Sequence, residues 1–227
     1  MAVAFCVIAL IFLGKTGILK LRSAEIEKRG NDLNILFVNC CISQKEKPCT
    51  LALCRAFIQA YIKQNPKDVL KELFLPDTDI SFFDVQRLNL RDDLLAQGQT
   101  QAPMFALANQ FATADKIIIG APYWDLSFPA LLKMYFENIS VNGIAYRYTE
   151  QGLQGLCRAQ KLIYITTCGG LIGKNNTGEQ YIRGLCEMFG IREFAALTAQ
   201  GLDIEGADVK QILAQAKIDT QKTAATW

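Results

Sequence analysis

Two neighbouring aromatic residues, Tyr123 and Trp124, stand where the sequence could form one wall of a site for a flat ring. They follow Ile117–Ile119, a short β-branched run bounded by glycine and proline, which predicts a strand buried on both faces of a parallel sheet. Ligands of open α/β sheets bind beyond the carboxyl ends of the strands, so both rings are expected at such a site. The alternative is that they only close the edge of the core.

A second segment could bind an anion. Pro48 and Thr50 begin a predicted helix that follows the apolar strand Ile35–Val38 and the loop Asn39–Lys47. Proline suits the first turn of a helix because its missing N–H has no helical partner there. Free N–H groups and the helix dipole at this point favour a phosphate, and Thr50 could add a hydroxyl. The alternative is that Thr50 is an ordinary first-turn residue.

A third segment, Thr167–Gly170, follows the predicted strand Leu162–Thr166. Its two glycines allow a ligand to approach the backbone closely. No G-x-G-x-x-G pattern follows the first strand, which argues against a dinucleotide site. A phosphate and a planar ring without that pattern indicate a mononucleotide, and FMN in a flavodoxin-like sheet is the obvious candidate.

The elements that must position these segments alternate between strand and helix. The others that the sequence predicts are the strand Val69–Leu75, a partly exposed helix and loop over the sheet at Ser81–Gln97, the helices Pro103–Ala114 and Ala130–Ile139, a projecting hairpin at Gly143–Gly152, the helix Tyr181–Phe189 stopped by Gly190, the strand Phe194–Thr198 and the helix Ala207–Asp219. Such alternation predicts a parallel sheet with right-handed crossovers. All three segments should therefore lie at one edge of it.

The composition excludes several classes of function. The chain has 227 residues, 51% of them hydrophobic, which is enough for a sizeable core. A net charge of +2 gives no electrostatic footprint for nucleic acid. Histidine is absent, which excludes Ser-His-Asp and Cys-His hydrolases and His-ligated metals. The eight cysteines include no C-x-x-C pair, so we expect no metal centre and free thiols in a cytoplasmic protein.

The first part of the chain reads as an extension, residues 1–32, ahead of a single domain, residues 33–227. Ala2–Leu13 is continuously apolar, but as a helix it would reach about 18 Å against the roughly 30 Å of hydrocarbon in a bilayer. It is either a floppy or helical extension, a weak membrane anchor, or the product of a start codon assigned too far upstream. The first and third interpretations are favoured over membrane contact.

From about Leu33 to its end, the chain resembles the flavodoxin-like, FMN-dependent NAD(P)H oxidoreductases, most closely the FMN-dependent NADH-azoreductase and quinone-reductase group. The motifs that carry the resemblance are Ala121–Trp124 with Leu132–Phe136, Tyr146–Gly152 with Gly155 and Leu156, and Thr166–Gly170. The resemblance implies a doubly wound, five-stranded parallel sheet in the order 2-1-3-4-5, with helices on both faces.

The resemblance also implies which residues bind FMN. They are Tyr123, Trp124, Asp125 and Leu126 in a first flavin loop, Thr167, Cys168, Gly169 and Gly170 in a second, and Cys41, Pro48, Cys49 and Thr50 at the phosphate. Azoreductases usually carry hydroxyl residues around the phosphate, and Thr50 is the only clear one kept here. Backbone N–H groups and Ser43 could compensate, so both a firmly held and an exchangeable FMN stay open.

The activity that the resemblance implies is two-electron, ping-pong reduction. NAD(P)H passes a hydride to the flavin and leaves, and a quinone, azo or nitro compound then takes the electrons in the same pocket. No side chain is assigned a catalytic role because the flavin carries the chemistry. Family members are homodimers with the active site at the interface. The alternatives are a flavodoxin-type electron carrier, which is usually more acidic than this chain, and a flavin-free binding protein on the same fold.

Overall fold

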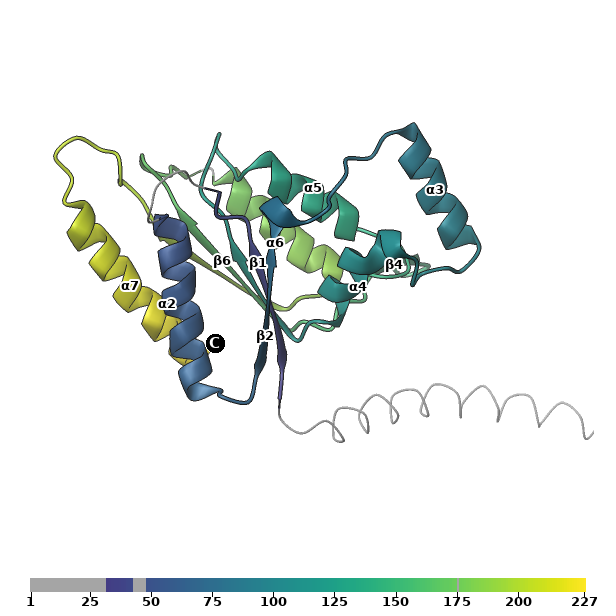
Figure 1. Cartoon of the computed structure of the whole chain (residues 1–227), viewed down its shortest axis with the longest axis horizontal. Helices are drawn as coiled ribbons and strands as arrows, with labels where there is room; N and C mark the ends of the chain where they lie inside the picture. The colour runs from purple at the N-terminus through teal and green to yellow at the C-terminus, as the bar shows by residue number, and fades with distance from the viewer. Residues whose placement is uncertain (1–31, 43–47, 175) are drawn as a thin grey trace, which may run out of the picture. The chain divides into compact units, whose positions relative to one another are not determined.

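A five-stranded parallel sheet forms the centre of the computed structural model, which describes residues 32–42, 48–174 and 176–227 (Figure 1). The apolar run predicted as an extension lies outside the described residues. The strands are β1 Asn34–Asn39, β2 Val69–Phe74, β3 Lys116–Gly120, β6 Lys161–Thr167 and β7 Glu193–Ala199. Their order in the sheet is β2-β1-β3-β6-β7, which confirms the predicted order, since β4 and β5 form a separate hairpin.

The three central strands are buried on both faces, as their uninterrupted apolar runs predict. Val38, Ile119 and Tyr164 lie side by side in the parallel register and face one hydrophobic core. The residues before Val38 and Ile119, Phe37 and Ile118, are paired in the same way and face the other core. Side chains of successive strand residues point to opposite faces, so one sheet supports two cores.

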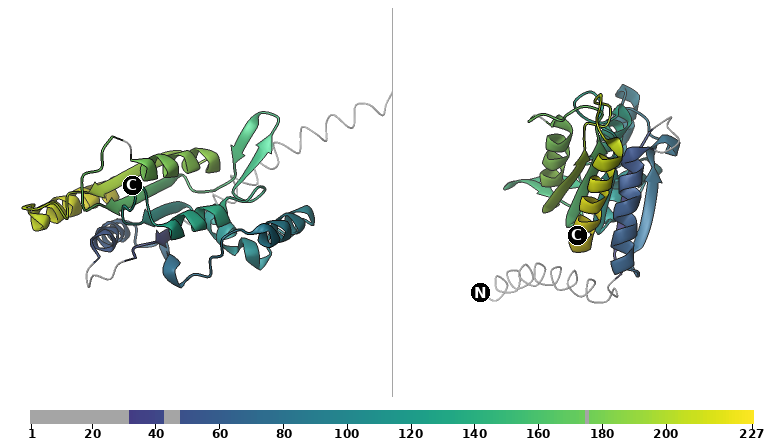
Figure 2. Two further views of the ribbon diagram at one scale, coloured as in Figure 1. Left: turned by 90° about the horizontal axis from the view of Figure 1, so that it is seen from above. Right: turned by 90° about the vertical axis from the view of Figure 1, so that its left-hand side faces the viewer.

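Helices cover both faces of the sheet (Figures 1 and 2). On one face lie α2 Cys49–Gln64 and α7 Val209–Thr226. On the other lie α4 Ala106–Thr113, α5 Ala130–Ile139 and α6 Thr177–Phe189. Two short 3₁₀ segments, η1 Leu75–Asp77 and η2 Pro103–Phe105, follow β2 and precede α4. This arrangement confirms the predicted doubly wound fold.

Helix α6 begins at Thr177, earlier than the predicted start at Tyr181. The reason is a polar cap: the Asn176 side chain accepts a hydrogen bond of 3.0 Å from the backbone N–H of Glu179. Such a cap satisfies a donor that the first turn of a helix otherwise leaves unpaired. The apolar periodicity marks only the part of α6 that faces the core, so it places the start too late.

Two other helices differ from their predicted positions. Helix α7 continues to Thr226, beyond the predicted end at Asp219, because Ala224 in its last turn is buried in the core that also contains Phe57 and Tyr61 of α2. The charged segment predicted over the sheet forms α3 Val85–Ala96, capped by Asp84. Helix α3 has no buried residue, and it extends beyond α5 instead of covering the sheet (Figures 1 and 2).

The predicted hairpin is formed by β4 Tyr146–Thr149 and β5 Gly152–Gly155, paired antiparallel. It projects from the rest of the domain (Figure 2). At its base, a Cβ atom on Gly155 would lie 2.1 Å from the backbone of Phe189, at the end of α6. Glycine is therefore needed for this close approach of two backbones.

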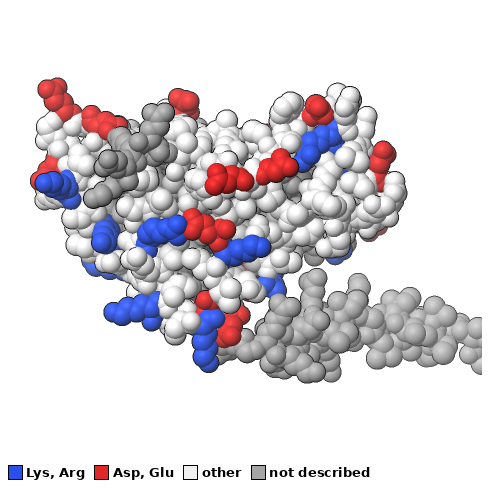
Figure 3. Space-filling model, in the orientation of Figure 1, with Lys and Arg blue, Asp and Glu red and all other residues white. Residues whose placement is uncertain are grey.

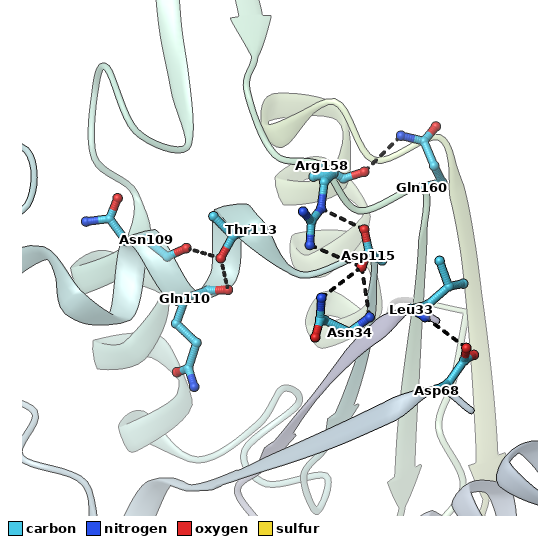
Figure 4. A network of polar contacts seen from close by, with 9 residues as sticks. All are labelled: Leu33, Asn34, Asp68, Asn109, Gln110, Thr113, Asp115, Arg158 and Gln160. Atoms are coloured by element: carbon cyan, nitrogen blue, oxygen red, sulfur yellow. Dashed lines mark hydrogen bonds and ion pairs between the residues drawn. The ribbon is translucent and has the colours of Figure 1, made fainter. Parts of the chain in front are cut away.

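At the amino edge of the sheet, the carboxylate of Asp115, just before β3, connects this strand to the starts of β1 and β6 (Figure 4). Asp115 accepts a hydrogen bond of 2.8 Å from the backbone N–H of Asn34 and pairs with Arg158 at 2.6 Å. Asp68 accepts the N–H of Leu33 at 2.9 Å and so connects β1 to β2. These contacts fix the strands at the edge opposite to the loops that follow them.

The described surface mixes both signs of charge. Both acidic and basic side chains lie on the face shown in Figure 3, the acidic ones more towards its upper part and the basic ones more towards its lower part. Among the helices within the described ranges, none is long and apolar enough to cross a bilayer. The same residues contain no group of three or more potential metal ligands.

Gly120, the last residue of β3, provides a test of the packing between the sheet and α2. A Cβ atom there would lie 2.5 Å from Cys54 Sγ. Because overpacking a full core is unfavourable, we expect Gly120→Ala to lower the free energy of unfolding by about 1–3 kcal/mol in urea denaturation. Made in a Cys54→Ala background, the same substitution should cost clearly less. An equal loss in both backgrounds would contradict this packing.

Candidate functional site

A cavity of about 650 Å³ opens at the carboxyl edge of the sheet. It brings together residues from three loops that are far apart in the sequence. The predicted site residues that line it are Cys41, Pro48, Cys49, Thr50, Tyr123, Trp124, Thr167, Cys168 and Gly169. Three others, Asp125, Leu126 and Gly170, belong to the same loops but do not line the cavity.

A fourth loop, between β7 and α7, contributes residues that the sequence reasoning missed. Leu202, Asp203 and Val209 line the cavity from this side, and Ile42 and Pro122 complete it. The rule that found the other three loops also applies here, because the segment after the last strand must lie at the same edge. The sequence therefore held the signal, although no motif marks these residues.

The end of β1 is held in place by a buried amide. The Asn39 side chain accepts the backbone N–H of Cys41 at 3.0 Å and donates to Glu72 at 2.7 Å. Glu72 also pairs with Arg55 of α2 at 2.7 Å. The Glu72 side chain of β2 thus connects Asn39 at the end of β1 to Arg55 of α2. This network fixes the turn that places Cys41 at the cavity.

Helix α2 starts at the cavity with Pro48 as its first flanking residue. Pro48 provides no side-chain cap, and the first turn contains no acidic residue. The first N–H groups of a helix have no partner within it and carry the positive end of the helix dipole. Cys49 and Thr50 therefore present a positive backbone end to this side of the cavity.

The hydroxyls of Thr50 and Thr167 form a buried hydrogen bond of 2.6 Å. This bond joins the start of α2 directly to the end of β6. Either oxygen can donate, and one bond between two hydroxyls uses only one of their two protons. The Thr pair can therefore set the spacing of two loops and still donate one hydrogen bond to a ligand.

The aromatic loop contains a tight turn of unusual backbone geometry. Trp124 and Ser127 exchange backbone hydrogen bonds of 3.2 and 2.8 Å, and the two residues between them have positive φ angles, 48° at Asp125 and 65° at Leu126. Two such residues are typical of a type I′ turn, in which glycine or asparagine is usual. The Thr177 hydroxyl donates to the carbonyl of Leu126 and helps to hold the turn.

Tyr123 lies at the inner end of the same loop. Its backbone N–H donates to the carbonyl of Thr167 at 2.9 Å, which ties the aromatic loop to the end of β6. Desolvation raises the pKa of the Tyr123 phenol, and the nearby Cys168 thiol raises it further. The phenol therefore keeps its proton well above neutral pH and can act as a hydrogen-bond donor.

The loops after β6 and β7 lie in direct backbone contact. The N–H groups of Asp203 and Leu202 donate to the carbonyls of Gly169 and Cys168 at 2.9 and 3.2 Å. A Cβ atom on Gly169 would lie only 2.2 Å from the Asp203 carboxylate. A side chain at this position would therefore displace the Asp203 side chain, which gives a structural reason for the first glycine of the pair.

The cavity is suited to a flat, phosphorylated ligand. Its volume lies within the range of about 300–1,000 Å³ that is usual for small-molecule sites. The described residues that line it include no lysine or arginine, so an anion would depend on the α2 backbone and the Thr hydroxyls. The chain also has no histidine to pair with a nucleophile. A histidine-activated nucleophile is therefore excluded at this site.

A parallel sheet with helices on both faces and a cavity beyond its carboxyl ends defines a protein of the flavodoxin type. A family model described as a flavodoxin-like fold matches residues 34–224. The FMN-dependent NADH:quinone oxidoreductase of Clostridium beijerinckii is 35% identical over 195 residues, which cover 85% of this chain and 98% of that protein. A second relative, FMN-dependent NADH:quinone oxidoreductase 2 of Clostridium acetobutylicum, is 37% identical over 169 residues, covering 72% and 84%.

The chain therefore belongs to the flavodoxin-like fold family, in the group of FMN-dependent NADH:quinone oxidoreductases. Solved structures agree on the fold. An azoreductase from Bacillus anthracis has a TM-score of 0.77 at 22% identity, covering 86% of this chain and all of that one. An FMN-dependent NADH-azoreductase from the same species, solved in complex with FMN, has a TM-score of 0.70 at 19% identity, covering 85% and 98%.

The left-handed turn offers a second test. A leucine in the left-handed conformation costs about 1–2 kcal/mol of folded-state strain. Glycine has no such strain, but its greater freedom in the unfolded state lowers the free energy of unfolding by roughly 0.5–1 kcal/mol. We expect Leu126→Gly to raise the free energy of unfolding by up to about 1 kcal/mol in urea. Leu126→Ala is the matched control, since it shortens the side chain but keeps the Cβ atom. A Gly variant less stable than the Ala variant would contradict the turn geometry.

Proposed function

We propose that this protein is an FMN-dependent NAD(P)H oxidoreductase that reduces quinones, and azo or nitro compounds, by two-electron ping-pong transfer. The observation that carries the proposal is the single cavity in which an uncapped helix start, an aromatic loop and a glycine-containing loop meet. The names of the relatives support the same cofactor, donor and class of acceptor.

The proposed FMN-binding residues divide between the two ends of the cavity. At the phosphate end, the backbone N–H groups at the start of α2 and the Thr50–Thr167 hydroxyl pair supply donors. At the ring end, Tyr123 and Trp124 form one wall and Cys168 another. The full set is Cys41, Pro48, Cys49, Thr50, Tyr123, Trp124, Asp125, Leu126, Thr167, Cys168, Gly169 and Gly170.

Bound FMN would supply the redox chemistry, taking a hydride from NAD(P)H and passing two electrons to the acceptor. The chain contributes binding, orientation and proton donors. With no histidine available, protons reach the reduced acceptor from water or from a tyrosine, and the Tyr123 phenol, which lines the cavity and has a raised pKa, is the candidate. The half-exposed Trp124 marks the open side, through which donor and acceptor would enter in turn.

We further propose a cytoplasmic homodimer whose catalytic domain comprises residues 33–227, with residues 1–32 as an extension. The family match, which begins at residue 34, supports this division. Large exposed apolar side chains beside the cavity loops, Leu126 and Leu171, support a partner surface near the site. The described cysteines are all free thiols, in keeping with a reducing compartment.

Purification followed by steady-state kinetics tests the proposal. The protein should bind FMN and oxidise NADH or NADPH with a quinone as acceptor. Because donor and acceptor share one opening, initial rates over a grid of both concentrations should give parallel double-reciprocal lines. Intersecting lines would reject the shared pocket. A protein that binds no flavin would reject the function itself.

Trp124 tests the ring end separately. Trp124 is 45% exposed, so loss of its side chain should change the free energy of unfolding of the apoprotein by less than about 1 kcal/mol. Stacking of an aromatic ring on a base contributes about 1–3 kcal/mol, so Trp124→Ala should weaken FMN binding roughly tenfold or more in a fluorescence titration. Trp124→Phe, which keeps a ring, should lose much less. Equal FMN affinity in all three proteins would remove Trp124 from the site.

A further inference from the structure

Two cysteine thiols lie together behind the phosphate end of the cavity. Cys54 Sγ and Cys41 Sγ are 2.5 Å and 3.2 Å from one point, the position of a Cβ on Gly120, so the sulfurs are at most 5.7 Å apart, the sum of those distances. Both thiols pack in the same hydrophobic core and are buried, with exposed fractions of 6% for Cys41 and 0% for Cys54. Their proximity depends on the absence of a side chain at Gly120.

The Cys54 thiol is the one that its surroundings hold in the protonated form. Burial raises the pKa of the Cys54 thiol well above its ordinary value, and a hydrogen bond with Cys41 raises it further. The positive charge of Arg55 acts in the opposite direction but is the smaller effect. Burial therefore keeps Cys54 protonated, so the first reaction with a reagent in the cavity falls to Cys41, which lines it.

Only one member of the pair is open to the cavity. Cys41 lines it, whereas Cys54 lies behind on α2. The adjacent thiol, Cys40, faces the core on the other side of the sheet, where burial raises its pKa to about 12. A reagent in the cavity can thus reach Cys41, which has Cys54 behind it, whereas Cys40 faces the opposite core.

We propose that Cys41 and Cys54 form a redox modification site that hydrogen peroxide entering the cavity converts to a disulfide. The Cys41 sulfur attacks one peroxide oxygen, the O–O bond breaks, and Cys41 becomes a sulfenic acid while one water leaves. The Cys54 sulfur then attacks the Cys41 sulfur, an S–S bond forms, and a second water leaves. Two thiols lose two electrons and two protons, and hydrogen peroxide is reduced to two waters.

The site is connected to the cofactor if the cavity binds FMN, and this part of the inference rests on the proposed function. FMN seated at the start of α2 would cover Cys41, so peroxide should reach the thiol pair mainly in the flavin-free protein. We expect saturating FMN to slow formation of the disulfide at least tenfold. Loss of FMN would then expose the pair to oxidation, and reduction by a dithiol would restore it.

Peptide mapping of the full-length chain tests the pair. Cys40 and Cys41 share one tryptic peptide, and Cys49 and Cys54 share the next, so a Cys40→Ala/Cys49→Ala variant leaves one thiol in each. After hydrogen peroxide treatment and alkylation, these two peptides should be linked, and dithiothreitol should release them. The wild-type digest, which yields the same linked peptides, is read in parallel. Absence of the link, or linkage of Cys41 to another thiol, would overturn the proposal.

Single variants test the order of the two steps. In Cys54→Ala, Cys41 should stop at the sulfenic acid and be trapped by dimedone. In Cys41→Ala, Cys54 should resist oxidation because it does not line the cavity. Oxidation of Cys54 in that variant at the wild-type rate would overturn the proposed route. The comparison with and without FMN tests a separate point. If the disulfide forms equally fast with saturating FMN, FMN does not cover Cys41. If no disulfide forms in the flavin-free protein, the thiol pair itself is wrong.

Discussion

The parallel alignment of the strands is the constraint on which the whole site depends. Because every strand of the sheet points the same way, the loops after β1, β3, β6 and β7 end at one edge and enclose one cavity. A salt bridge and hydrogen bonds of Asp115 fix the opposite edge (Figure 4). Cross-loop contacts then set the fine geometry, above all the bond between Thr50 and Thr167 and the one from the Tyr123 N–H to the Thr167 carbonyl.

The cavity has an uncommon chemical character for an anion site. Its described lining offers backbone donors, hydroxyls and three thiols but no cationic side chain, and its one charged residue is Asp203. Backbone N–H groups carry no net charge and bind a phosphate through hydrogen bonds that point at it and through the helix dipole. The helix start and the Thr pair therefore matter more here than they would beside a lysine or an arginine. The same thiol-rich lining brings Cys41 next to Cys54.

The sequence predicted the features that rest on strong periodic patterns. The β-branched run Ile117–Ile119 and its neighbours predicted buried parallel strands, and the loops that follow them do meet at one cavity. The starts and ends of helices were less predictable, because Asn176 caps α6 before its apolar face begins. The left-handed turn at Asp125 and Leu126 has no glycine to reveal it. The contribution of Asp203 depends on packing between two loops, which no local motif encodes.

The central claim is that the start of α2 holds the phosphate of a flavin mononucleotide, and it is tested most directly by comparing two flavins. FMN and riboflavin carry the same ring and differ only in the phosphate. Titration of the apoprotein, followed by flavin fluorescence, should give an affinity for FMN at least tenfold higher than for riboflavin, since a difference of about 1.4 kcal/mol or more is expected for charged hydrogen bonds to backbone donors. Equal affinities would contradict the account, because the ring alone would then explain binding.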